Sequence, residues 1–196
     1  MPEPAKATGL TFDAAEHRYY LGTRELPSVT SILKDVGLVD DTWFTEEAAE
    51  RGTAIHLAVE RLHASQPYFN VRSEYVGYME AYLAFLASSR FLHEASELRV
   101  YDPIRGYAGT IDLIGALPNH KHVLIDIKTG SVPPTVGPQT YAYARCLETF
   151  HERFALHLKA DGTFRLIPLR DWREDEADFL AALRLYMRKR TQYGTR

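Results

Sequence analysis

The chain has little cysteine, no long apolar segment and no excess of positive charge. One cysteine among 196 residues excludes an internal disulfide framework, an all-cysteine zinc site and an iron–sulfur cluster. No apolar run approaches the roughly 20 residues that cross a bilayer, so no membrane partner is expected. With a formal net charge of −3, a nucleic-acid partner would have to meet a local basic surface. The basic stretch at residues 184–190 is one candidate, although it equally fits a solvated helix face.

Length and composition fit one globular domain. The chain is long enough for one well-formed core, and 45% hydrophobic and 25% charged residues are ordinary values. No repeat or linker divides the sequence, so residues 1–196 are expected to form a single domain. Residues 1–8 lack the basic and apolar regions of a signal peptide and are expected to be a disordered lead-in. Cys146 lies in an apolar helical run and is expected to be a packed thiol, which favours a cytoplasmic setting.

The order of elements predicts an α/β (α+β) fold with one mixed sheet. Two short strands at residues 10–13 and 17–21 precede two helices, for which Ser28 and Thr45 are suitable caps. The later elements, in chain order, are a helix at about residues 73–90, strands at 97–101 and 107–116, a strand ending at Lys128, a helix through 141–147, strands at 153–158 and 163–169, and a helix at about 171–193.

Asp126 and Lys128 lie in the stretch His-Val-Leu-Ile-Asp-Ile-Lys-Thr-Gly at residues 122–130. The apolar run before Asp126 indicates a buried strand. Side chains alternate along a strand, so the two residues share a face about 7 Å apart. A carboxylate can hold a hard divalent cation, and an ammonium can steady an attacking water or a developing negative charge. The pair therefore suits metal-assisted cleavage of a phosphodiester; a simple strand-end ion pair is the alternative.

Asp112 stands between Ile111 and Leu113 inside another apolar strand. A carboxylate there costs free energy unless it meets a cation or several donors. If the two strands are hairpin neighbours, Asp112 and Asp126 can lie side by side, and a divalent metal would remove their repulsion. Gly109 permits another backbone to approach closely. The alternative is an aspartate bonded to a turn.

Two helices supply further candidates. His56 follows Ile55 on an apolar-patterned helix, so its imidazole is either a core or boundary residue or a metal ligand facing the sheet. Gly52, one turn earlier, is expected to let that helix approach another backbone. Gln139 and Tyr143 project from one helix face, where they either contact phosphate and support the site or belong to an ordinary amphipathic helix.

In chain order these positions read Gly-x-x-x-His, Gly-x-x-Asp, Asp-x-Lys and Gln-x-x-x-Tyr. The set resembles the RecB-like branch of the PD-(D/E)XK nuclease superfamily over roughly residues 28 to 150. Stand-alone phage-type exonucleases and the mitochondrial genome maintenance exonuclease group look similar. The resemblance implies a restriction-endonuclease-like core, with a central mixed sheet flanked by helices and the helical segment 43–90 covering the site.

The resemblance also implies three groups of site residues. The metal ligands would be His56, Asp112, Asp126 and the carbonyl of Ile127. The catalytic lysine would be Lys128, acting with the two aspartates. The residues that support the site or contact DNA would be Gln139, Tyr143, Glu97 and Arg51.

The implied activity is Mg²⁺- or Mn²⁺-dependent hydrolysis of DNA by a bacterial or phage-encoded cytoplasmic protein of DNA repair or recombination. The substrate would be single strands or strand ends, because a covering helical segment restricts access and favours an exonuclease. Many relatives hold an iron–sulfur cluster with four cysteines, which this chain cannot do. It also lacks helicase motifs, so it would work alone or with a separate helicase or recombination protein. A nuclease-fold module that binds DNA without cutting it and a protein-interaction domain are the alternatives.

Overall fold

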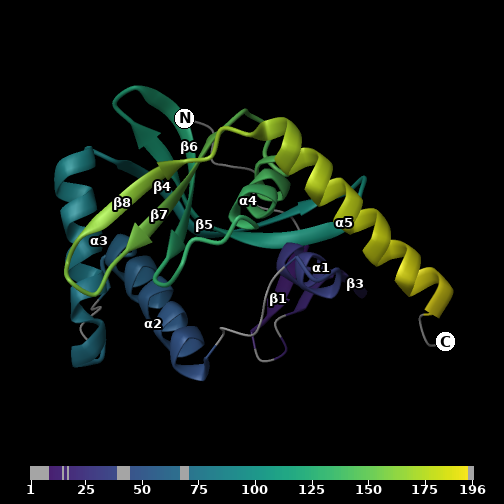
Figure 1. Ribbon diagram of the computed structural model, residues 1–196, viewed down its shortest axis with the longest axis horizontal. Helices are drawn as coiled ribbons and strands as arrows, with labels where there is room; N and C mark the ends of the chain where they lie inside the picture. Colours follow the sequence, from purple (N-terminus) through teal and green to yellow (C-terminus); the bar gives the residue numbers. More distant parts are fainter. Residues whose placement is uncertain (1–8, 15, 17, 39–44, 67–70, 194–196) are drawn as a thin grey trace.

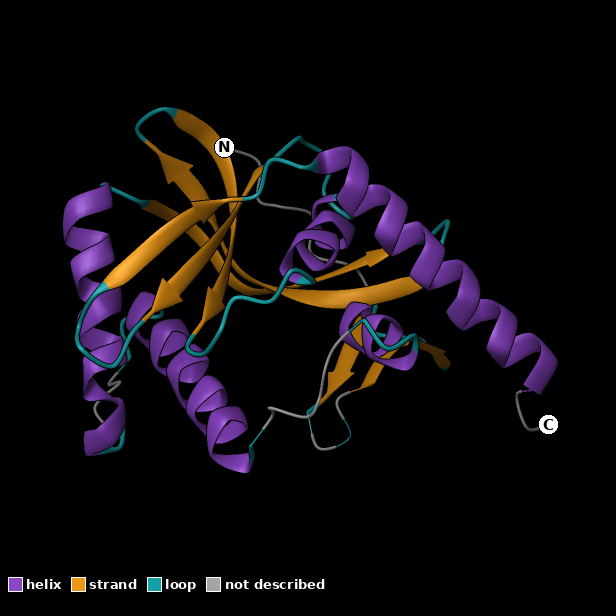
Figure 2. Cartoon of the chain, viewed as in Figure 1, coloured by secondary structure: helices purple, strands orange, loops and turns teal. Residues whose placement is uncertain are grey.

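The computed structural model describes residues 9–14, 16, 18–38, 45–66 and 71–193, which form two β-sheets with helices packed around them (Figure 1, Figure 2). The larger sheet has five strands in the spatial order β4-β5-β6-β7-β8. Their bounds are β4 (Leu92–Asp102), β5 (Tyr107–Leu117), β6 (His120–Lys128), β7 (Glu152–Leu158) and β8 (Phe164–Pro168).

The strand directions make the larger sheet mixed. β4, β5 and β6 form an antiparallel meander, β6 and β7 run parallel, and β8 pairs antiparallel with β7. Helix α4 (Val136–Ala144) lies in the crossover that a parallel pair requires. The α/β (α+β) class is therefore confirmed, and the arrangement is consistent with a restriction-endonuclease-like core.

Helices cover both faces of this sheet, and β6 contributes to the apolar cluster on each face. Ile125 and Ile127 pack with residues of α2 (Glu46–His63) and of α3 (Val76–Ser89), which the 3₁₀ turn η2 (Ser73–Tyr75) precedes. Leu124 packs in the cluster of α1 (Val29–Asp35), α4 and α5 (Trp172–Tyr193). Burial on both faces explains why this strand is a continuous apolar run in the sequence.

Both expected helix caps are present. The Ser28 hydroxyl accepts a hydrogen bond from the amide of Ser31 at 2.9 Å at the start of α1. The Thr45 hydroxyl accepts one from the amide of Ala48 at 3.1 Å at the start of α2. These bonds satisfy amides that the first turn of a helix leaves without partners. The start of α2, and with it the place of His56 along the helix, therefore follows from the sequence.

The N-terminal strands form a second sheet of their own. β1 (Leu10–Asp13), β2 (Arg18–Leu21) and β3 (Arg24–Leu26) pair antiparallel in that order. The expectation of a single mixed sheet is wrong, because these strands form a second sheet, and one of them, β3, was not expected from the sequence. That strand has three residues, too few for an alternating pattern to reveal it.

Two boundaries of the expected elements are also wrong. β4 begins at Leu92 instead of residue 97, and a β-bulge between His93 and Ala95 interrupts the alternation that marks a strand. α4 ends at Ala144 instead of continuing to residue 147.

Three remaining expectations concern the chain as a whole. Cys146 is partly buried, and its thiol donates to the carbonyl of Ala142 at 3.4 Å, as expected of a packed thiol. The lead-in expected at residues 1–8 lies outside the described residues. Within the described part of the chain, no helix is both long and apolar enough to span a bilayer.

Candidate functional site

The candidate site lies where β5 and β6 separate. Their pairing reaches Leu113 opposite Ile125, and each strand then continues past that point in its own direction. Asp112 and Asp126 are the next residues on the two strands. The hairpin assumed in the sequence argument therefore exists, and it brings the two aspartates to the point of divergence.

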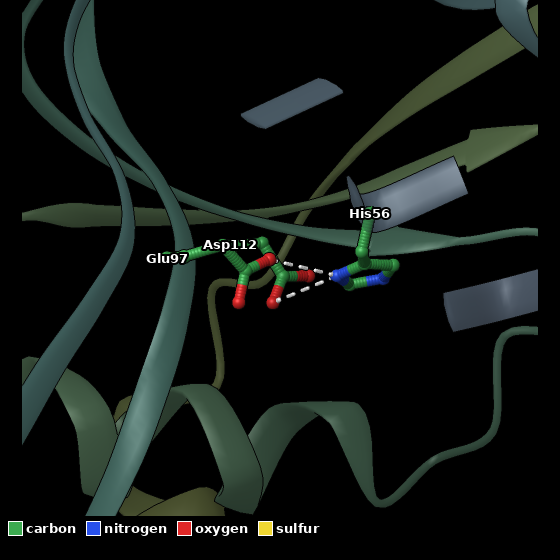
Figure 3. A group of neighbouring side chains, drawn as sticks. All are labelled: His56, Glu97 and Asp112. Carbon is green, nitrogen blue, oxygen red and sulfur yellow. Dashed lines mark hydrogen bonds and ion pairs between the residues drawn. The ribbon is translucent and has the colours of Figure 1, made fainter. Parts of the chain in front are cut away.

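Three side chains from three elements converge there (Figure 3). Nδ1 of His56, on α2, lies 3.2 Å from Oε1 of Glu97 and 3.6 Å from Oδ1 of Asp112. One ligand-type atom from each of these residues lies within 4.8 Å of the other two. The three atoms are therefore close enough to bind one cation together.

Glu97 enters this group through an unusual backbone conformation. Its φ of +49° is in the left-handed region, which costs a residue with a side chain free energy. The pairs Ser96–Leu113 and Leu98–Ile111 on either side place Glu97 opposite Asp112. Glu97 was expected only to support the site or contact DNA, and the structure brings it into contact with His56.

Asp112 is held by the backbone of β6. Its Oδ2 accepts a hydrogen bond from the amide of Ile127 at 2.6 Å, which bridges the gap between the separating strands. Burial, opposed by the charge of His56 and assisted by the neighbouring Asp126, raises the pKa of Asp112 to about 7. The contact seen for Ile127 is thus made by its amide; a ligand role for its carbonyl stays a prediction.

Asp126 and Lys128 form the expected pair on one face of β6. Nζ of Lys128 lies 2.6 Å from Oδ2 of Asp126, whose side chain is only 3% exposed. Burial alone would lower the pKa of Lys128, but Asp126 and Asp112 outweigh it and raise that pKa. Lys128 therefore remains an ammonium at neutral pH. Asp126 is not a member of the group formed by His56, Glu97 and Asp112.

Gln139 and Tyr143 of α4 act on Asp126 as one unit. The side-chain amide of Gln139 donates one hydrogen bond to Oδ1 of Asp126, at 3.2 Å, and another to the hydroxyl of Tyr143, at 3.1 Å. A Cβ on Gly109 would lie 2.3 Å from Cε1 of Tyr143. The close approach expected at Gly109 is therefore made by an aromatic ring, whereas a backbone was expected.

Arg51 lies on α2 beside the end of β6. Its Nε donates to the hydroxyl of Thr129 at 3.3 Å, and its guanidinium lies 5.4 Å from the ring centroid of Tyr78 on α3. The expectation for the neighbouring Gly52 is wrong, because a Cβ there would meet no atom of another described element within 4 Å. The helix thus makes no close approach at that glycine.

The charges of the site are unbalanced without a cation. Burial lowers the pKa of His56, but Asp112 and Glu97 outweigh that effect and raise it to about 9. Three carboxylates, those of Glu97, Asp112 and Asp126, face one ammonium and one imidazolium. Oδ2 of Asp126 is buried, and its contact is the 2.6 Å ion pair with Lys128, without an aligned hydrogen bond among the described residues. Carboxylate oxygens and an imidazole are a suitable donor set for Mg²⁺ or Mn²⁺.

One partly buried hydroxyl pair next to the site was not expected from the sequence. The hydroxyls of Tyr19, on β2, and Thr110, on β5, lie 2.7 Å apart. Burial raises the pKa of Tyr19, and Glu97 and Asp112 raise it further against the effect of Arg99. Nothing in the sequence indicates this contact, because β2 and β5 are 91 residues apart at that point.

No protein-family model matches the chain, and no curated protein matches it. Among solved structures it is similar to an alkaline exonuclease, LHK-Exo, from Laribacter hongkongensis, with 16% identity, a TM-score of 0.41, and coverage of 84% of this chain and 92% of that one. A second structure, LHK-Exo in complex with dAMP, has 16% identity and a TM-score of 0.39, with 85% and 92% coverage.

Proposed function

We propose that the chain is a metal-dependent deoxyribonuclease of the RecB-like PD-(D/E)XK type. The observation that carries this proposal is the convergence of His56, Glu97 and Asp112 beside the Asp126–Lys128 pair. If the site contained only ion pairs, one carboxylate for each positively charged side chain would be enough. Here three carboxylates gather at the divergence of two strands, and two of them are held by hydrogen bonds from Ile127 and Gln139.

The metal ligands in this proposal are His56, Asp112 and Glu97, with Asp126 and the carbonyl of Ile127 completing the shell. A divalent ion bound there would lower the pKa of a water ligand and offset charge on the scissile phosphate. Mg²⁺ and Mn²⁺ fit this oxygen-rich donor set. With its single cysteine, the chain has no place for an iron–sulfur cluster.

Lys128 supplies positive charge to the reacting phosphate. Asp126 and Asp112 raise the pKa of Lys128, so it is an ammonium in the metal-free protein. Its role is therefore to orient the attacking water or to stabilise the negative charge that develops on the phosphate. Asp126 fixes the position of Lys128 through the 2.6 Å ion pair.

Gln139, Tyr143 and Arg51 are positioning or DNA-binding residues. Gln139 orients Asp126, and Tyr143 orients Gln139. Arg51, at the end of β6, can reach a phosphate of the DNA backbone. The segment 43–90 covers the site in this proposal, so the substrate would be a single strand or a strand end and the activity an exonuclease. A separate helicase or recombination protein would supply that substrate, in repair or recombination.

The test is digestion of end-labelled single- and double-stranded DNA with MgCl₂, MnCl₂ or EDTA. The wild-type protein should degrade DNA only with a divalent ion, and Asp112→Asn should abolish degradation while the protein stays folded by circular dichroism. Binding of DNA without cleavage under either ion would instead favour a nuclease-fold binding module. A protein that binds neither DNA nor metal would favour an interaction domain.

A further inference from the structure

We propose that Arg99 and the β1–β3 sheet form a binding track for one strand of DNA, in which Arg99 contacts a phosphate next to the scissile one. This inference rests on the proposed function and extends it to a surface that the sequence argument did not include. It assigns Arg99 as a substrate-binding residue and predicts that the substrate on this track is single-stranded.

Arg99 lies close to the metal-ligand group on the same side of the sheet. It pairs directly with Thr110, and Thr110 is two residues from Asp112 along β5, so their side chains share a face. Along β4, Arg99 is two residues from Glu97, a separation of about 7 Å. A strand in duplex DNA rises about 3.4 Å per nucleotide, and an extended single strand spans more, so this cation lies within one or two nucleotides of the cluster.

The guanidinium of Arg99 is exposed and is held by an aromatic ring. Its Cζ lies 5.5 Å from the ring centroid of Phe12 on β1. Among the described residues no carboxylate forms an ion pair with Arg99, whereas Arg18, Arg72 and Arg105 each have one. An arginine that is fixed by a ring, with its charge unused, can bind phosphate at little entropic cost.

The small sheet is attached firmly enough to serve as one wall of the site. Tyr19 and Leu26 are buried against Ala108 of β5, and Phe12 and Tyr101 pack around them. Phe12 also contacts the Tyr19 ring, with centroids 4.7 Å apart. Because the Tyr19 hydroxyl bonds to Thr110, the position of Phe12, and therefore of Arg99, is fixed relative to Asp112.

The opposite wall repeats the same chemistry. Arg51 on α2 also lies over a ring, that of Tyr78, at 5.4 Å. Figure 1 shows α2 and the β1–β3 sheet both below the larger sheet in this view, α2 to the left and the small sheet to the right. Two ring-supported cations thus flank the carboxylates, which is the combination of positive charge and aromatic surface that binds single strands.

The experiment measures binding of a labelled single-stranded oligonucleotide by fluorescence anisotropy in EDTA, where no cleavage occurs. Arg99→Ala should weaken binding roughly tenfold and reduce the slope of log K against log salt by about 0.7, the loss of one phosphate contact. Arg99→Lys should keep the slope, because it keeps the charge. Arg173→Ala removes an equally exposed arginine on α5 and should change neither quantity.

The outcomes separate this inference from the proposed function. If the wild-type protein binds and cleaves DNA but Arg99→Ala binds with unchanged affinity and salt slope, the track is wrong and the nuclease remains. If the wild-type protein neither binds nor cleaves, the proposed function itself fails. A melting temperature of Arg99→Ala equal to that of the wild type shows that the weaker binding is not caused by unfolding. Tighter wild-type binding of duplex than of single strand would overturn the single-strand assignment.

Discussion

At the scale of single residues, Glu97 is where stability and function conflict. Its left-handed φ is a conformation that glycine adopts without cost. The strain persists because the conformation turns the carboxylate toward His56, 3.2 Å away. Backbone strain of this kind is common at functional sites.

We therefore expect Glu97→Gly to stabilise the metal-free protein by about 1 kcal/mol and to abolish metal-dependent cleavage. Ser96→Gly is the matched control, since Ser96 has a negative φ in the same strand and glycine there should destabilise it. Urea unfolding in EDTA measures both effects. A Glu97→Gly protein that is less stable than the wild type, or that still cleaves DNA, would contradict this role of Glu97.

Lys128→Met should lower kcat roughly 100- to 1,000-fold and leave Mn²⁺ binding in place, because the ammonium acts on the phosphate and not on the metal. It should also destabilise the fold by about 3 kcal/mol, since the buried Asp126 loses its counterion. The double variant Asp126→Asn, Lys128→Met should recover most of that loss. Calorimetry with Mn²⁺, steady-state cleavage rates and chemical unfolding measure the three quantities. Equal loss of metal binding and cleavage in Lys128→Met would argue against the assigned role.

The residues that the sequence predicts best are those whose contacts are local in the strand or helix. Asp126 and Lys128 meet because side chains alternate, and Gln139 and Tyr143 meet because they are four residues apart on a helix. The contact of Glu97 with His56 could not be predicted, because it accompanies a left-handed φ that the local sequence does not encode. Tyr19 was missed because its partner is distant in the chain.

At the scale of elements, α4 is positioned on the sheet by a single glycine. A methyl group on Gly109 would overlap the Tyr143 ring, and Tyr143 supports Gln139, which holds Asp126. The distance between α4 and β5 therefore sets the position of a carboxylate on β6.

Gly109→Ala should consequently lower cleavage activity at least tenfold and destabilise the fold by about 1–3 kcal/mol through overpacking. Gly52→Ala is the comparison, because the added methyl meets no atom within 4 Å and should stabilise α2 by about 0.5–1 kcal/mol. Thermal melts of both variants and cleavage rates of Gly109→Ala provide the test. A Gly109→Ala protein with wild-type activity would show that the Tyr143–Gln139–Asp126 chain does not matter.

The elements themselves were largely predictable, because their signals are local. Two side-chain caps, turn residues and apolar runs located α1, α2, β5 and β6. The small sheet was predicted only in part, since β3 has three residues, and its packing against β5 depends on tertiary contacts between Tyr19, Leu26 and Ala108.

At the scale of the whole molecule, the site makes stability depend on pH. Burial and Asp126 raise the pKa of Asp112 from 3.8 to about 7, and the two carboxylates, against the effect of burial, raise that of His56 from 6.5 to about 9. At these two groups the folded protein binds more protons than the unfolded chain. Burial lowers the pKa of His63, His93, His151 and His157, so these groups bind fewer protons in the folded state below about pH 6.5. The metal-free protein should therefore lose stability as pH rises from about 6.5 to about 9, where the four histidines are neutral in both states.

Because a bound cation replaces those protons, saturating MgCl₂ should raise Tm more at about pH 8.5 than at about pH 6. Scanning fluorimetry in MgCl₂ and in EDTA at both pH values measures the difference. His56→Gln removes one of the groups and should reduce the pH dependence in EDTA. A Mg²⁺-induced Tm shift that is the same at both pH values would contradict the coupling of metal and protons at this site.

The most direct measurement of the central claim is a crystal structure of the protein grown in MnCl₂, with anomalous data that locate manganese. The proposal predicts an anomalous peak at the divergence of β5 and β6, with its ligand atoms from His56, Glu97 and Asp112 at about 2.1 Å. No peak at that point, or manganese held only by other residues, would contradict the metal site and the nuclease chemistry derived from it.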